Sequence, residues 1–210
     1  ARNRFVYVAD LGLDRVLIYK FDAGKGNLSR EESAPSKGSK NKAPDFFSAT
    51  LAPGSGPRHV AFSSDGNFMY VLGEMDATVT VFVNDRKTYH SIQKISSLPA
   101  DYSGENAAAE IAIHPSGKFL YTSNRGVDSI AEFSVDRASG KLTLVENVST
   151  FGKAPRHFAI DPTGTRLLVA NQDTGNIVEY SIDSTTGKLT RVGKMAGVAS
   201  PVCLIFVPAE

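Results

Sequence analysis

Short runs of apolar residues, about six positions long, alternate with turn-forming residues along most of the chain. A run from Arg58 to Ser63 ends at the turn Ser64-Asp65-Gly66-Asn67, and further runs follow at Phe68 to Gly73 and Thr78 to Val83. Asp and Gly supply the side-chain cap and the positive φ that a hairpin turn needs. Apolar and polar positions do not alternate cleanly within the runs, as expected where both faces of a sheet are packed. The pattern predicts an all-β fold of short antiparallel strands.

This pattern repeats three times. The copies run from Gly56 to Asp85, from Ala107 to Asp136 and from Ala154 to Asp183. Their turn glycines Gly66, Gly117 and Gly164 recur after 51 and 47 residues. Outer strands are predicted at His90–Ser96, Leu142–Val148 and Leu189–Lys194. A period of roughly 40 to 50 residues, with several strands in each unit, is typical of a β-propeller blade. We therefore expect a β-propeller of four-stranded antiparallel blades.

Both ends of the chain match parts of the repeat. Arg4 to Asp22 aligns with the second and third strands of a blade, and Ser200 to Pro208 aligns with a first strand. We expect the C-terminal strand to complete the N-terminal blade, because this would remove an open sheet edge. The predicted domain is one propeller over 1–210, with blades at about 1–52 closed by 200–208, 57–98, 108–151 and 155–196. Four-bladed propellers are uncommon, so we expect the chain to be the C-terminal part of a longer one.

One segment departs from the repeat. Residues 23–45 form a polar insertion rich in Gly, Ser, Pro and Lys, and Phe46 to Leu51 is predicted to return as an outer strand. We expect the insertion to be a surface loop. Its lysines either guide an anionic ligand or only keep the loop solvated.

Composition narrows the function classes. The formal net charge is +1, from 23 Lys and Arg against 22 Asp and Glu, so neither a nucleic acid nor a membrane surface is an expected partner. The sequence has no secretory leader and no long apolar run, which predicts a cytoplasmic protein. The single cysteine, Cys203, falls in a predicted inner strand, where it is expected to be a small buried side chain. The four histidines lack the spacing of metal ligands, so no metal and no cofactor is predicted.

The repeats differ where the first and second strands of each blade meet at one end of the central channel. The first strands begin with Arg58-His59, Ala109-Glu110, Arg156-His157 and Val202-Cys203; the second strands end with Leu11, Glu74, Arg125 and Gln172. Antiparallel pairing brings these two sets to the same rim. A purely structural repeat has no need for such different charges at equivalent positions. The disagreement predicts an asymmetric pocket at this rim.

Three segments resemble the seven-bladed lactonase family, which includes the propeller-type 6-phosphogluconolactonases and the fungal 3-carboxy-cis,cis-muconate cycloisomerase. They are GPRHVAFSSDGNFMYVLGE, AAAEIAIHPSGKFLYTSNRGVDSIAEF and APRHFAIDPTGTRLLVANQ. The resemblance implies seven blades and a ligand cleft at one end of the channel. It also implies a site of arginines, a glutamate and a histidine, and Arg58, Glu74 and Arg125 match such positions. The family's histidine would lie in a first strand before VADLG, which this sequence does not contain.

The resemblance implies an enzyme that processes an anionic lactone, and the residues suit that chemistry. Glu74 can activate water or move a proton. Guanidinium groups grip phosphate and carboxylate oxygens, so Arg58 and Arg125 would hold the ligand and stabilise an oxyanion. The additional substrate contacts predicted are Glu110, Arg156 and His157.

Alternatives stay open for both the residues and the function. The arginines can instead form ion pairs with Glu74 or Glu110 across blades, and His59 and His157 are expected to make hydrogen bonds between blades. The favoured activity is hydrolysis of a sugar-phosphate lactone such as 6-phosphogluconolactone. The alternatives are lactone formation by a cycloisomerase and a propeller that binds without catalysis.

Overall fold

The computed structural model describes residues 4–30, 47–85, 88–195 and 197–207, and sixteen strands lie within them. The first sheet contains β1 (Phe5–Asp10), β2 (Arg15–Asp22), β3 (Asn27–Arg30) and β4 (Ser48–Thr50), and the second contains β5 (Pro57–Phe62), β6 (Phe68–Gly73), β7 (Thr78–Asp85) and β8 (Thr88–Ser96). The third contains β9 (Ala107–Ile113), β10 (Phe119–Arg125), β11 (Ser129–Val135) and β12 (Leu142–Ser149), and the fourth contains β13 (Pro155–Ile160), β14 (Arg166–Asn171), β15 (Asn176–Ile182) and β16 (Leu189–Met195). All pairings are antiparallel. The predicted all-β fold of four-stranded blades is confirmed.

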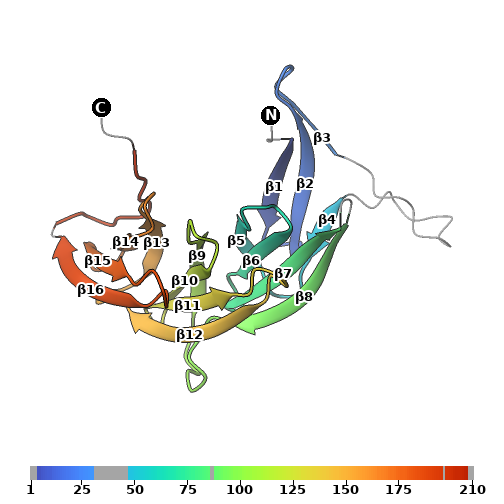
Figure 1. The fold of residues 1–210 in the computed structure, drawn as a ribbon. Helices are drawn as coiled ribbons and strands as arrows, with labels where there is room; N and C mark the ends of the chain where they lie inside the picture. Colours follow the sequence, from blue (N-terminus) through green and yellow to red (C-terminus); the bar gives the residue numbers. More distant parts are fainter. Residues whose placement is uncertain (1–3, 31–46, 86–87, 196, 208–210) are drawn as a thin grey trace.

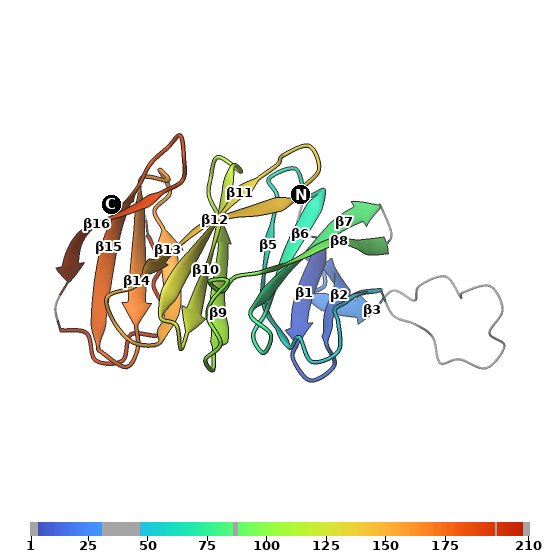
Figure 2. The same cartoon turned by 90° about the horizontal axis from the view of Figure 1, so that it is seen from below.

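The four sheets stand side by side in an open arc (Figures 1 and 2). The first strands β5, β9 and β13 lie on the inner side of the arc, where β5 packs against β9 and β9 against β13. The last strands β8, β12 and β16 lie on the outside (Figure 1). This is the arrangement of propeller blades around a channel.

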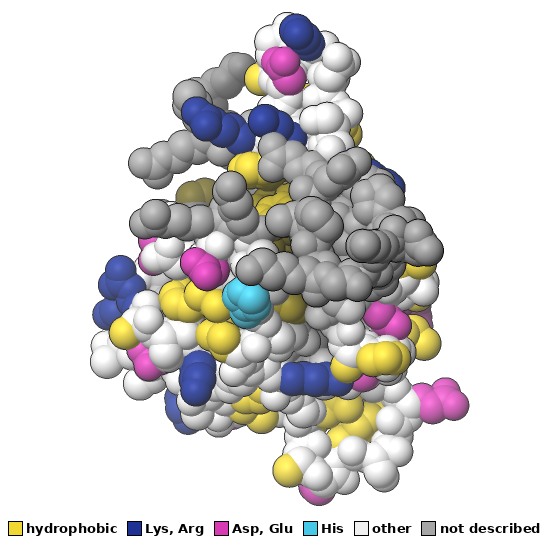
Figure 3. Space-filling view, turned by 90° about the vertical axis from the view of Figure 1, so that its right-hand side faces the viewer, with side chains coloured by type: hydrophobic (Ala, Val, Ile, Leu, Met, Phe, Trp, Pro, Cys, Tyr) yellow, Lys and Arg dark blue, Asp and Glu magenta, His cyan; other side chains and the backbone are white. Residues whose placement is uncertain are grey.

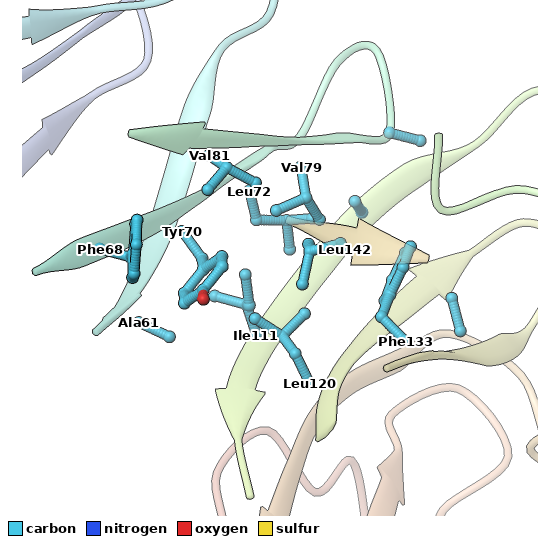
Figure 4. Close-up of a cluster of buried hydrophobic side chains, with 13 residues drawn as sticks. Ala61, Phe68, Tyr70, Leu72, Val79, Val81, Ile111, Leu120, Phe133 and Leu142 are labelled. Carbon is cyan, nitrogen blue, oxygen red and sulfur yellow. The ribbon is translucent and has the colours of Figure 1, made fainter. Parts of the chain in front are cut away.

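Buried apolar side chains join each blade to the next. Figure 4 shows the cluster between the second and third blades, in which Tyr70 and Leu72 from β6 meet Ile111 and Leu120 from β9 and β10. Similar clusters join the first blade to the second and the third to the fourth. Because both faces of each inner blade are covered in this way, its strands show no alternation of apolar and polar residues.

A residue with positive φ recurs at the equivalent turn of all four blades, which lies between β1 and β2 in the first blade and between the second and third strands in the others. These residues are Asp14, Ala77, Asp128 and Gly175. The carboxylate of Asp14 accepts the backbone N–H groups of Gly54 and Gly56 at 2.8 Å, and that of Asp128 accepts the N–H of Ala154 at 2.9 Å. Gly56 and Ala154 immediately precede β5 and β13. These contacts therefore position the first strand of the following blade, which carries the candidate site residues.

The insertion interrupts an outer strand of the first blade. Tyr19 of β2 pairs with Arg30 of β3, whereas Leu17 pairs with Ser48 of β4, so only one residue of β2 separates the two short outer strands. The predicted returning strand is confirmed as β4, although the start of the predicted loop also forms β3. Residues 31–46, with most of the insertion's lysines, lie outside the described residues.

The predicted closure of the N-terminal blade is wrong in this structure. Residues 201–207 form no strand, and the sheet of β1 contains only β2, β3 and β4 besides it. The backbone N–H of Leu204 instead donates to Nδ1 of His157 at 3.2 Å, which places this segment beside β13. Four blades cover only part of a circle, so the two ends of the arc lie apart (Figure 1). For the same reason Cys203 is exposed rather than buried, since no sheet covers it.

On the face in Figure 3, around the atoms that are not described, basic and acidic side chains are interspersed and hydrophobic ones form small patches. This agrees with the near-neutral formal charge. No helix within the described part of the chain could cross a membrane.

Candidate active site

A β-bulge lies near the start of each of the three inner strands. In β5 the bulged residue is Arg58, in β13 it is Arg156, and in β9 the register shifts between Ala108 and Ile111. A bulge sets two residues against one and re-aims their side chains. Nη1 of Arg58 accordingly lies 3.2 and 3.3 Å from the two ring nitrogens of its neighbour His59. The bulges bring consecutive charged side chains together at one rim of the arc.

Glu74 lies between the two arginines that were predicted to share a site with it. Its Oε2 is 3.3 Å from Nε of Arg58, and its Oε1 is 2.7 Å from Nη2 of Arg125. The three side chains are 16 to 22% exposed, so the cluster is open to a ligand but largely shielded from water. The three residues thus lie together as predicted, and the alternative of an ion pair between blades is also present, between Glu74 and Arg125.

Backbone carbonyl groups fix both guanidinium groups. Nη1 of Arg58 donates to the carbonyl oxygen of Ala109. Nε and Nη2 of Arg125 donate to the carbonyl oxygens of Ala107 and Ala108 at 3.2 and 3.3 Å. Nη2 of Arg58 and Nη1 of Arg125 have no hydrogen-bond partner among the described residues. Each arginine thus keeps one terminal nitrogen free to donate to an anionic ligand.

Burial and neighbouring charges act on Arg58. Partial burial lowers the pKa of its guanidinium, Glu74 opposes this shift, and the charges of Arg125 and Arg156 add to it. Even a lowered arginine pKa leaves the group charged near neutral pH. Three arginines therefore share this rim within electrostatic reach of one another.

A second row of equivalent positions forms a bridge across three blades. The carboxylate of Glu110 accepts a hydrogen bond from Nδ1 of His59 at 2.9 Å, and its Oε2 lies 3.2 Å from Nε2 of His157. Its Oε1 also accepts the N–H of Ile111 at 3.0 Å. The expected hydrogen bond between blades is confirmed for His59, whereas His157 lies within ion-pair distance of Glu110.

His157 is held in one tautomer. Its Nδ1 accepts the N–H of Leu204, so the proton of the neutral ring lies on Nε2, which is 3.2 Å from Oε2 of Glu110. Burial lowers the pKa of His157, although the nearby Glu110 opposes the shift. Sγ of Cys203 lies 3.9 Å from Nε2 and extends the row to a fourth position. His157 therefore lies beside Glu110 in its neutral form.

The remaining histidines lie away from this rim. His114 is buried, with Nε2 2.8 Å from the carbonyl oxygen of Gly164 and Nδ1 2.8 Å from Oγ of Ser116. His90 is exposed on β8. The described residues contain no cluster of His, Cys, Asp and Glu suited to a metal ion.

A cleft of 510 Å³ beside Arg125 is lined in addition by residues that were not among the predicted site residues. Its lining residues come from the third and fourth blades and include Lys153, Asp128 and Asp173. Nζ of Lys153 is 3.0 Å from Oδ2 of Asp128, an ion pair that links the two blades. Lys153 lies in the link before β13, outside the aligned strands, so the comparison of repeats gave no signal for it.

Known proteins share this fold and these segments. A family model described as "Lactonase, 7-bladed beta-propeller" matches residues 1–206. The 6-phosphogluconolactonase of Bacillus subtilis is 35% identical over 158 residues, which cover 74% of this chain and 40% of that protein. A solved protein of Lactobacillus plantarum has a TM-score of 0.83 and 36% identity, covering 95% of this chain and 54% of that one. The periplasmic gluconolactonase of Pseudomonas aeruginosa has a TM-score of 0.82 and 31% identity, covering 98% of this chain and 54% of that one.

This chain spans about half the length of these relatives or less. Those whose names state an activity are lactonases, so the cycloisomerase alternative gains no support from them. One of them is periplasmic, and cytoplasmic location stays a prediction for this chain. Since the family model matches nearly the whole chain, the protein belongs to the seven-bladed β-propeller lactonase family.

Proposed function

We propose that the whole protein hydrolyses a sugar-phosphate lactone such as 6-phosphogluconolactone, using the cluster of Glu74, Arg58 and Arg125. The observation that carries this proposal is the position of Glu74 between two guanidinium groups from neighbouring blades, each with a free terminal nitrogen. The named activity of the Bacillus subtilis relative supports the choice of substrate.

The cluster contains the groups that ester hydrolysis needs. Glu74 acts as the general base that removes a proton from water while the water oxygen attacks the lactone carbonyl carbon. The carbonyl oxygen becomes an oxyanion, which the free N–H groups of Arg58 and Arg125 stabilise. When the bond between that carbon and the ring oxygen breaks, the protonated Glu74 returns its proton to the ring oxygen. Water is thus added across the ester, and the product is a hydroxy acid.

Glu110 and His157 join the strands on which the arginines lie. They were predicted to contact substrate, but they lie 3.2 Å from each other, and Glu110 also accepts a hydrogen bond from His59. We propose that their bridge holds β9 and β13 in the register that presents the arginines. It therefore contributes through position rather than through chemistry.

The test compares the full-length natural protein with its Glu74→Gln variant. The change keeps the shape of the side chain but removes the basic group, so turnover should fall by about 100-fold or more while binding of the product is largely retained. Freshly generated lactone is required, and spontaneous ring opening has to be subtracted. Glu146→Gln changes a partly exposed carboxylate on β12 outside the cluster, so it is a matched control and should keep wild-type turnover.

Two outcomes would contradict the proposal. If Glu74→Gln keeps wild-type turnover, Glu74 is not the base. If the full-length protein opens no lactone above the spontaneous rate, a propeller that binds without catalysis becomes the better interpretation.

A further inference from the structure

Arg156 is the repeat equivalent of Arg58. Both are the bulged residue of an inner strand, both follow a buried proline, and both precede a histidine that lies beside Glu110. The middle blade has Ala109 at this position, so the two arginines lie on either side of a blade that contributes no side-chain charge there. The third inner strand therefore presents a second arginine to the same rim.

The partners of the two arginines differ. Arg58 meets Glu74, which follows the second strand of its own blade, whereas the equivalent residue of the fourth blade is Gln172. The N–H of Glu74 donates to the carbonyl of Gly56, and that of Gln172 to the carbonyl of Ala154, so the two positions match in the backbone. A neutral amide thus stands where a carboxylate would neutralise the arginine.

The guanidinium group of Arg156 is consequently uncompensated. It makes no ion pair and no hydrogen bond with any described residue, and the side chain is half-buried. Its charge is close enough to contribute to the lowered pKa of Arg58. A guanidinium group is more weakly hydrated than an ammonium group, and a bidentate anion is its best partner when water is partly excluded.

We propose that Arg156 is the subsite for the phosphate group of the substrate and sets the preference for phosphorylated over neutral lactones. This inference rests on the proposed lactone hydrolysis. Arg58 and Arg125 are already shared with Glu74 and with backbone carbonyls, and their free nitrogens face the reacting ester in the proposed reaction. Arg156 therefore supplies the positive charge that binds the phosphate group.

The test measures selectivity in the full-length natural protein. Wild type, Arg156→Gln and Arg156→Lys are assayed with 6-phosphogluconolactone and with gluconolactone, which has the same ring without the phosphate. We expect Arg156→Gln to lower the ratio of kcat/KM for the two lactones by roughly 10- to 100-fold, mainly through KM for the phosphorylated one. Arg156→Lys keeps the charge without the planar guanidinium group, and its kcat/KM ratio should lie between those of wild type and Arg156→Gln. Arg166→Gln removes the same charge from the far end of the same blade and should leave the ratio unchanged.

Calorimetry separates this inference from the proposed function. The open-chain products 6-phosphogluconate and gluconate bind without turnover, and Arg156→Gln should weaken only the first by the same factor. Equal losses for both ligands, or no loss for either, would overturn the subsite. Absence of lactone turnover in wild type would overturn the proposed hydrolysis, while the calorimetric comparison would still decide the role of Arg156. Circular dichroism checks that each variant is folded.

Discussion

The two ends of the blades are built from the same three repeats but differ in what the repeats keep constant. At the turn rim, which we define as the turns ending at Gly66, Gly117 and Gly164, each glycine N–H donates to the carbonyl three residues earlier at 2.8 to 2.9 Å. All three glycines have positive φ between 69° and 74°. The geometry is the same in each blade because the hairpin requires it. Identity between the repeats here reflects folding.

The site rim, which carries Arg58, Glu74, Glu110, Arg125 and Arg156, shows the opposite behaviour. Equivalent backbone positions hold side chains of opposite or no charge, and most of their contacts cross from one blade to the next, whereas Arg58 and Glu74 meet within the second blade. A blade needs none of these differences in order to fold. The comparison teaches that in this repeat protein similarity identifies structural residues, and difference at a converging rim identifies candidate functional ones.

The largest effect is expected from removing an arginine at the site rim. Arg125→Ala should weaken binding of the hydroxy-acid product by about 1.5 to 3 kcal/mol, because a charge-assisted contact to the carboxylate formed by ring opening is lost. The melting temperature should move little, since Glu74 keeps its contact with Arg58. Titration calorimetry with the product measures the affinity.

Arg166→Ala is the matched control for this prediction. Arg166 begins β14 at the turn rim, where its Nε lies 3.4 Å from Oε1 of Glu179. Its loss removes the same charge and one ion pair but should leave affinity unchanged. If Arg125→Ala kept full affinity and lost much stability, the site rim would be structural after all.

A smaller effect is expected at Glu132, where the repeats differ away from both rims. This β11 carboxyl is 2% exposed, its Oε1 accepts the N–H of Leu189 at 3.0 Å, and its Oε2 has no partner within the described structure. The equivalent residue of the second blade is Val81. Burial raises the pKa of Glu132 from its ordinary 4.5 to about 8, so the carboxyl stays protonated in the folded protein at neutral pH.

This pKa shift predicts a pH-dependent stability. The unfolded carboxyl ionises above about pH 4.5 and the folded one only near pH 8, so stability should fall as pH rises between these values. Glu132→Gln removes the titration, and its advantage over wild type should grow by about 2 kcal/mol from pH 5 to pH 6.5. Urea unfolding at both pH values measures it. A constant difference between the two proteins would show that Glu132 does not titrate in this way.

The strands and the residues of the site rim could be predicted from the sequence because they depend on local sequence patterns. The turn Ser64-Asp65-Gly66-Asn67 located β6 to the residue, and aligning the repeats placed Glu74 and Arg125 at one rim. The bulges at Arg58 and Arg156 could not be predicted, since a bulge depends on how two strands pair. The pairing of the C-terminal segment with the N-terminal blade could not be predicted for a similar reason. Alignment identifies Ser200 to Pro208 as first-strand sequence, but the number of blades in the ring decides which sheet this segment can join.

The smallest effect is expected at the turn rim. Gly66 has φ +73° and no atom within 4 Å of an added Cβ, so Gly66→Ala should cost only the strain of a left-handed alanine, about 1 kcal/mol of unfolding free energy. Gly193 of β16 is the matched control, because it also has open space but no positive φ, and Gly193→Ala should be neutral or slightly stabilising. Neither change should alter lactone turnover per folded molecule. Denaturant unfolding together with the lactone assay tests both points. A loss of turnover in Gly66→Ala at temperatures where the protein is fully folded would mean that the turn rim also contributes to function, and the separation of the two rims would no longer hold.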